Sequence, residues 1–273
     1  MAETVPNPME DWTVVLPRRN KTRKTIPTLK SCQEQQQATQ WFPTDVENDP
    51  KRESDLMQKM LTYMKKLQDS QFYQTFLSQI ETPEILENFI KILGTESSMQ
   101  MVIYGIGSIE SYEPPRLQLS LAILLKRKFS WIDTIEVFDP IISLAESRVL
   151  EALGCSVLSV NEFGRRRALS PTLFFMPHCE AELYDNLLQA NWGVDTLNRM
   201  ALFGNSFSVY QHYGSIISNS TITSSRQHIL HVSSFVEEVK IATISDDYFR
   251  AFNGSSWHFF RLDSESQLQL VKL

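Results

Sequence analysis

The chain has 273 residues, of which 42% are hydrophobic and 21% charged, and its formal net charge is -6. This composition is typical of a globular protein, and it excludes a fibrous repeat protein, a wholly disordered chain and a strongly basic duplex-binding protein. Three widely spaced cysteines argue against a disulfide framework. Because we find no signal peptide and no apolar run of about 20 residues, we expect neither secretion nor a membrane segment.

Residues 1–55 have almost no apolar periodicity, and we predict a disordered tail. Between residues 18 and 30 the tail carries six cations and no acid. A nuclear-targeting signal is one interpretation of this basic cluster, and a solvated charged segment is the other. The candidate targeting residues are Arg18, Arg19, Lys21, Arg23 and Lys24.

Residues 56–94 are predicted to form a helical lead-in to a single α/β domain that covers residues 56–273. Leu56, Met60 and Met64 begin an apolar stripe at helical spacing. A third helix is expected after Thr82, which is a candidate cap, with Pro83 at its first position and Gly94 at its end.

Residues 100–273 alternate short apolar runs with helical segments, which predicts a Rossmann-like α/β core. Such alternation is typical of a mainly parallel sheet with helices on both faces. The predicted strands cover 101–106, 135–138, 157–160, 172–176 and 199–203, and the predicted helices 115–127, 142–153 and 180–191. For 229–239 and 257–262 the pattern leaves helix and strand open. A surface loop is expected at 215–226.

The first predicted strand runs into a glycine turn, where we expect the first candidate binding residues: Gly105, Gly107, Ser108 and Glu110. Loops at the carboxyl ends of parallel strands line the ligand crevice of such folds. A dinucleotide fingerprint would have a third glycine where Glu110 stands, and a carboxylate beside a pyrophosphate is unfavourable. The turn therefore favours a ligand without phosphate, such as S-adenosylmethionine, over a nucleotide. A tight turn without any ligand is the equal alternative.

Two further candidate positions follow later strands. Asp139 comes after the second strand, where an acid can bind a ribose hydroxyl, although Asp139 is also a candidate helix N-cap before Pro140. His178 and Cys179 follow the fourth strand, and their ring and thiol are candidates for the reactive end of the site. The alternative is that they only shape a strand-to-helix turn. No paired ligand spacing indicates a metal site.

Several strings resemble the Sensitivity-to-Red-Light-Reduced family. They cover residues 102–119, 176–179, 183–192 and 203–207, and the string at 11–19 resembles the start of plant members. Asn205, in the fourth of these strings, joins the candidate binding residues. The family has no established catalytic residues that could be transferred to this chain.

The resemblance implies a regulator of circadian-clock input and phytochrome B red-light signalling, which acts on the expression of clock-controlled genes in nucleus and cytoplasm. It implies protein partners in light and clock signalling, and no direct nucleic-acid or membrane binding. Relatives outside plants are associated with haem biosynthesis. The alternative hypothesis is an enzyme or sensor that binds S-adenosylmethionine or a nucleotide at the Gly105/Gly107 loop, linked to haem metabolism. No cofactor is required by the sequence.

Overall fold

The computed structural model describes residues 38–210, 227–232, 234–242, 248–265 and 268. These residues belong to one compact unit that spans Gln36–Leu273. The basic cluster at 18–24, the predicted loop at 215–226 and Cys32 lie outside the described residues.

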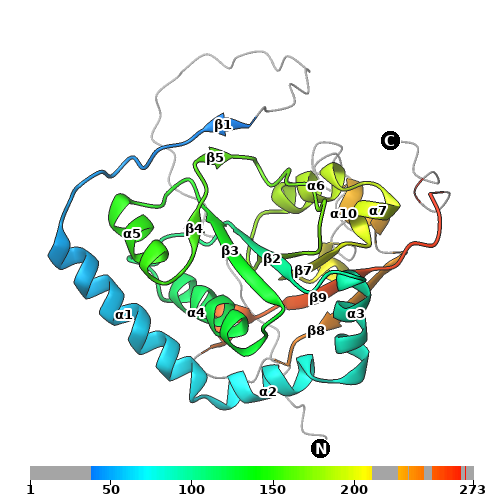
Figure 1. Cartoon of the computed structure of the whole chain (residues 1–273), viewed down its shortest axis with the longest axis horizontal. Coiled ribbons are helices and arrows are strands. Elements are labelled where there is room, and N and C mark those ends of the chain that lie inside the picture. The colour runs from blue at the N-terminus through cyan, green and yellow to red at the C-terminus, as the bar shows by residue number, and fades with distance from the viewer. Residues whose placement is uncertain (1–37, 211–226, 233, 243–247, 266–267, 269–273) are drawn as a thin grey trace, which may run out of the picture. The chain divides into compact units, whose positions relative to one another are not determined.

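A seven-stranded mixed sheet forms the centre of the fold and confirms the predicted α/β class (Figure 1). In spatial order its strands are β4 (Ser156–Val157), β3 (Ile132–Phe138), β2 (Met99–Tyr104), β6 (Thr172–Met176), β7 (Met200–Asn205), β9 (Ser255–Phe260) and β8 (Val236–Lys240). The first five are mutually parallel, whereas β9 is antiparallel to both of its neighbours. A separate antiparallel pair joins β1 (Thr39–Gln40) to β5 (Val160–Asn161).

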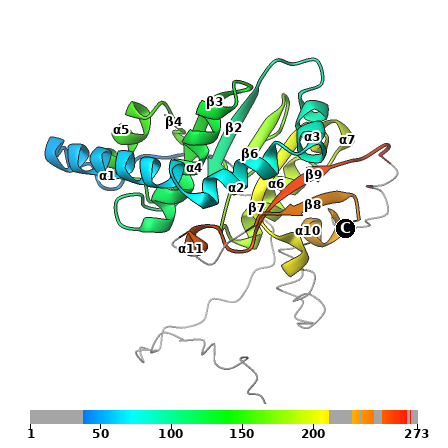
Figure 2. The same ribbon diagram turned by 90° about the horizontal axis from the view of Figure 1, so that it is seen from below.

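Helices cover both faces of the sheet, as predicted (Figures 1 and 2). The first face is covered by α1 (Pro50–Gln68), α2 (Gln71–Ile80), α3 (Pro83–Leu93), α4 (Glu113–Lys128), α5 (Leu144–Ala152) and α11 (Phe249–Phe252). The second face is covered by α6 (Ala181–Ala190), α7 (Val194–Leu197) and α10 (Gln227–Val232). Strand residues alternate between the two cores: Met101 and Ile103 face the first, and Val102 and Tyr104 the second.

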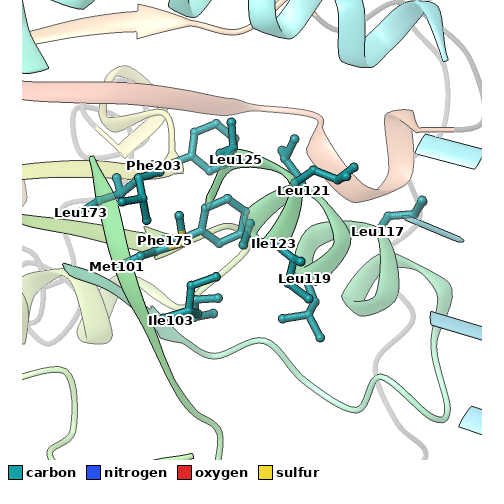
Figure 3. Packing of buried hydrophobic residues seen from close by; sticks show 14 of the residues in the cluster. Met101, Ile103, Leu117, Leu119, Leu121, Ile123, Leu125, Leu173, Phe175 and Phe203 are labelled. Carbon is teal, nitrogen blue, oxygen red and sulfur yellow. The ribbon is translucent and has the colours of Figure 1, made fainter. Parts of the chain in front are cut away.

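Helix α4 is buried on all sides over residues 117–125. Leu125 and Ile123 of α4 point toward the strand side chains Phe203 and Phe175 (Figure 3), while α1 and α11 pack against the helix as well. This arrangement explains the longest apolar run of the sequence, because a helix enclosed by protein needs no polar face. Among the described residues, no helix has the length and apolar character required to cross a membrane.

The predicted boundary at residue 55 is too late. Both β1 and the start of α1 precede it, and Asp49 caps α1 by accepting the backbone N–H groups of Lys51 and Arg52. The first turn of α1 is polar, so the apolar stripe from which we placed the helix begins only at Leu56.

Two predicted helix caps also need correction. Thr82 occupies the N-cap position of α3, but its hydroxyl donates to the Gln79 carbonyl oxygen at 2.9 Å instead of capping the helix. The cap of α5 is Ser143, which forms a capping box with Glu146, and not Asp139. Of the segments left open, 229–239 contains parts of both α10 and β8, and 257–262 lies mostly in β9.

Candidate functional site

Strands β2 and β6 lie side by side in the sheet (Figure 2), and the order in which the chain adds strands reverses between them. From β2 the chain continues outward to β3 and β4, and from β6 it continues to β7 on the other side. The loops that leave β2 and β6 therefore diverge, and ligands of open α/β sheets bind in the crevice between such loops. A pocket of about 520 Å³ lies at this point. It is lined by Gly105, Asp139, Pro140, Phe163, His178, Cys179, Glu180, Glu182, Leu183 and Asn186.

The glycine turn after β2 forms one side of the pocket. Gly105 and Gly107 have φ angles of +66° and +74°, which glycine adopts without strain. Asp139 holds this turn, because its Oδ2 accepts the Gly107 N–H at 2.8 Å and its Oδ1 accepts the Ile141 N–H at 3.0 Å. Burial raises the pKa of Asp139, while these two hydrogen bonds oppose the rise. Asp139 thus positions the turn as well as lining the pocket.

His178 lies at the corner after β6 with a φ of 59°, in the left-handed region. Its backbone N–H donates to Asn205 Oδ1 at 2.8 Å. Its ring lies between Gln118 Nε2, 3.4 Å from Nδ1, and the Asn253 carbonyl oxygen, 3.1 Å from Nε2. Since an amide nitrogen donates and a carbonyl accepts, these contacts suit a ring whose proton is on Nε2. Both ring nitrogens therefore have partners.

Cys179, the next residue, packs against the glycine turn. Its thiol donates to the Tyr104 carbonyl oxygen at 3.2 Å, and burial raises its pKa. A Cβ added to Gly105 would lie 2.6 Å from Cys179 Sγ. The thiol accordingly acts as a buried packing group in this geometry.

The loop that carries Phe163 forms another part of the pocket wall. Phe163 has a φ of 51°, its N–H donates to Asn161 Oδ1 at 2.9 Å, and its carbonyl accepts Asn186 Nδ2 at 3.0 Å. In the described part of the chain, Phe163 and His178 are the two non-glycine residues with positive φ, and both line this pocket. Such strain costs about 1–3 kcal/mol per residue and concentrates at ligand-binding sites.

A partly buried polar network holds Glu162, the residue before Phe163. The Tyr104 hydroxyl donates to Glu162, and Arg166 binds Glu162 at 2.9 Å and Glu136 at 2.7 Å. Burial raises the pKa of Tyr104, so the phenol remains protonated. The arginine run at 165–167 is therefore partly internal, because Arg166 is committed to two carboxylates.

The structure divides the predicted binding residues into three groups. Gly105, Asp139, His178 and Cys179 line the pocket, and Gly107 is joined to it through Asp139. Asn205 lines a neighbouring pocket of about 350 Å³ that shares His178 with the first.

Ser108 and Glu110 form the group that does not line either pocket. The Ser108 hydroxyl donates to Glu146 Oε1 at 2.7 Å, and Glu110 is ion-paired with Arg52 of α1 at 2.6 Å. Among the residues that the structure describes, no three His, Cys, Asp or Glu side chains come together to hold a metal ion.

The sequence reasoning missed Phe163, Asn186 and Gln118. Gln118 is 3% exposed, and a lone amide inside an apolar helix was a visible signal that a polar partner lies nearby. Phe163 precedes Gly164 in a predicted connection, where a left-handed aromatic residue has no sequence signature. Asn186 is an ordinary polar residue of a helix, so only the fold reveals its place.

Comparison with known proteins shows to which family this chain belongs. A family model described as the SRR1 domain matches residues 85–259. The chain belongs to the SRR1 family. It is 51% identical over 273 residues to Protein SENSITIVITY TO RED LIGHT REDUCED 1 of Arabidopsis thaliana. The aligned region covers 99% of this chain and 98% of the relative. It is 40% identical over 123 residues to an SRR1-like protein of Mus musculus, with 42% of this chain and 47% of the relative covered.

Two solved structures are similar to the chain at low sequence identity. One is a cofactor-bound protein, Rv0187 from MTB, with 11% identity, a TM-score of 0.40 and coverage of 80% of this chain and 93% of that one. The other is a putative O-methyltransferase of Klebsiella pneumoniae, with 10% identity, a TM-score of 0.42 and coverage of 80% and 92%.

Four of the strings that resemble the SRR1 family lie in the described part of the chain, and these four meet in space. The string at 102–119 supplies β2, the glycine turn and the start of α4, and those at 176–179 and 183–192 supply the His178 corner and α6. The string at 203–207 supplies Asn205, which binds the His178 backbone. In this SRR1-family chain the strings therefore build the pocket and its support.

Proposed function

We propose that this chain is a regulator of circadian-clock input and of phytochrome B red-light signalling, which acts on the expression of clock-controlled genes. The observation that carries the proposal is its 51% identity, over nearly the whole of both chains, to a plant protein named for reduced sensitivity to red light. A regulator of this kind needs no catalytic step of its own.

Complementation tests the proposal. The chain is expressed in an Arabidopsis line that lacks the named relative. We expect it to restore both the inhibition of seedling elongation by red light and normal clock-gene rhythms. Normal protein levels without restoration of either response would contradict the proposal.

The proposal includes protein partners in light and clock signalling, and action in both nucleus and cytoplasm. The basic cluster at 18–24 supports nuclear targeting. Replacing Arg18, Arg19, Arg23 and Lys24 by neutral residues should reduce nuclear accumulation of a fluorescent fusion. An unchanged distribution would leave the cluster as a solvated segment.

A second candidate function is that of a sensor or enzyme that binds S-adenosylmethionine or a nucleotide. The pocket at the β2–β6 switch point favours it, because glycine turn, post-strand aspartate and His178 corner open onto one cavity. We would measure thermal shifts with S-adenosylmethionine, nucleotides and haem precursors. A ligand at a hundredfold excess over its Kd stabilises a fold by about 2.7 kcal/mol, which raises the Tm of a domain of this size by about 5–10 °C. No shift at millimolar concentration would contradict this function.

A further inference from the structure

Charged groups near the pocket restrict what the pocket can bind. Three carboxylate residues line it, Asp139, Glu180 and Glu182, and no lysine or arginine is among its lining residues in the described part of the chain. Arg165 reaches the pocket wall only through Asn186, whose Oδ1 accepts a hydrogen bond from Arg165 Nη2 at 2.8 Å. A bound anion would face uncompensated negative charge.

The two helices that begin at this edge also disfavour phosphate. A helix N-terminus binds phosphate through its free backbone N–H groups. Helix α4 begins Glu113-Pro114-Pro115, so two of its first three residues have no N–H to donate. Helix α6 begins after Glu180 and carries Glu182 in its first turn, so its own carboxylates occupy the positive end of the helix dipole.

The carboxylates of α6 are available to a ligand. The Glu180 side chain does not cap the helix, and both Glu180 and Glu182 are exposed. Among the described residues, neither side chain takes part in an ion pair. Each can therefore face a positive group in the pocket without breaking an ion pair.

Part of the remaining lining is apolar and can contact a flat ring. Pro140, Phe163 and Leu183 line the pocket, and the backbone of Phe163 is held by Asn161 and Asn186. An aromatic side chain in a fixed, strained backbone conformation is preorganised for stacking.

We propose that the pocket selects a ligand with a flat heterocyclic ring, a net positive charge and no phosphate, and that Glu180 and Glu182 recognise the charge. S-adenosylmethionine, with its sulfonium, represents this class. The inference rests on the second candidate function and narrows it by excluding nucleotides.

Isothermal titration of the purified full-length chain tests the inference with four probes. S-adenosylmethionine and S-adenosylhomocysteine share a skeleton but differ by one positive charge, whereas ATP and NAD carry phosphates. We expect S-adenosylmethionine to bind more tightly than S-adenosylhomocysteine, and ATP and NAD to give no binding at millimolar concentration.

The double variant Glu180→Gln/Glu182→Gln should weaken S-adenosylmethionine binding about fivefold and S-adenosylhomocysteine binding less than twofold, since exposed charge pairs contribute about 0.2–1 kcal/mol each. The ratio of the two affinities isolates charge recognition, because general loosening of the pocket would weaken both ligands alike. Glu151→Gln, the same change at an exposed position of α5, is the matched control and should alter neither affinity.

Three results would overturn the inference, and they differ in what else they affect. If ATP or NAD binds as tightly as S-adenosylmethionine, the charge argument fails while the ligand-binding function stands. If the affinity ratio is unchanged in the double variant, Glu180 and Glu182 do not recognise the charge. If no probe binds, both the inference and the ligand-binding function fail, whereas the signalling role is decided separately by complementation.

Discussion

At Gly105 two constraints act on a single residue. Its φ of +66° lies where a side chain is strained, and an added Cβ would lie 2.6 Å from Cys179 Sγ. Gly154 shares the first constraint, with a φ of +85°, but has no atom within 4 Å of an added Cβ. Comparing substitutions at the two glycines therefore separates the cost of backbone strain from the cost of steric overlap.

We expect Gly105→Ala to lower the free energy of unfolding by about 2–4 kcal/mol, the sum of left-handed strain and overpacking. Gly154→Ala should cost about 1–2 kcal/mol from strain alone. Urea unfolding measures both. Adding Cys179→Ala to the Gly105→Ala variant should cost less than it does in the wild type, because it removes the atom that overlaps. Equal losses for the two glycine variants would show that the contact with Cys179 does not matter.

The thiols give a second prediction at the residue scale. Burial raises the pKa of Cys155 to about 12, and it also raises the pKa of Cys179 well above that of a free thiol. Almost no thiolate is therefore present at pH 8. In a Cys32→Ala variant we expect iodoacetamide to leave both thiols unmodified in the native protein and to alkylate both in urea. Mass spectrometry locates the label. Rapid native labelling of Cys179 would restore it as a candidate nucleophile.

At the scale of elements, α1 is attached to the glycine loop through charge. Arg52 Nε and Nη2 bind the two carboxylate oxygens of Glu110 at 2.7 and 2.6 Å, and Arg52 Nη1 also binds Asp45 at 2.8 Å. Hydrogen bonding to Arg52 lowers the pKa of Glu110. This bidentate pair joins residues 58 positions apart and sets the loop against the helical layer.

A double-mutant cycle of Arg52→Ala and Glu110→Ala should give a coupling energy of about 0.5–1 kcal/mol at pH 7, since the pair is partly exposed. Because the pKa of Glu110 is lower in the folded state than its ordinary value of 4.5, the stabilisation is present above pH 4.5 and is lost as the pH falls through the folded-state pKa. Urea unfolding at a series of pH values checks this dependence.

The exposed pair of Glu87 and Lys91 on α3 is the control for this cycle, and it should give a smaller coupling. A coupling at Arg52 and Glu110 that stays constant down to pH 3 would contradict the assigned charge interaction.

The same elements explain what the sequence could and could not predict. The strands and helices of the core followed from apolar runs, since buried parallel strands such as Met101–Tyr104 are continuously hydrophobic. Strand β8 reads Val236-Glu237-Glu238-Val239-Lys240. Because three of its five residues are charged, the sequence does not distinguish this strand from the neighbouring helix α10. Contacts such as Arg52 with Glu110 depend on the tertiary fold, so local patterns contain no trace of them. The sequence predicts Asp139 after a strand, but its hydrogen bond to the Gly107 N–H depends on the tertiary fold.

At the scale of the whole compact unit, the segment 38–49 acts as a strap that pairs with β5 and runs past α5 to α1 (Figure 1). Trp41 Nε1 donates to the Pro140 carbonyl oxygen at 3.2 Å, and its ring packs edge-on against Phe138 at 5.5 Å. The Leu144 N–H donates to the Asp45 carbonyl oxygen at 2.9 Å. Because Pro140 lines the pocket, the strap braces one of the pocket walls.

The strap should therefore contribute measurably to global stability. We compare a chain that begins at residue 38 with one that begins at residue 47, so that only the strap differs. Losing the hydrogen bonds to β5 and the Trp41 contacts should lower the free energy of unfolding by about 2 kcal/mol and the Tm by about 4–8 °C, as measured by calorimetry.

In the longer chain, Trp41→Ala should reproduce about half of the loss. Phe42→Ala, at a side chain 71% exposed, should change the free energy of unfolding by less than about 0.5 kcal/mol. Equal melting temperatures for the two truncated chains would mean that the strap rests on the core without stabilising it, and the pocket wall at Pro140 would then depend on α5 alone.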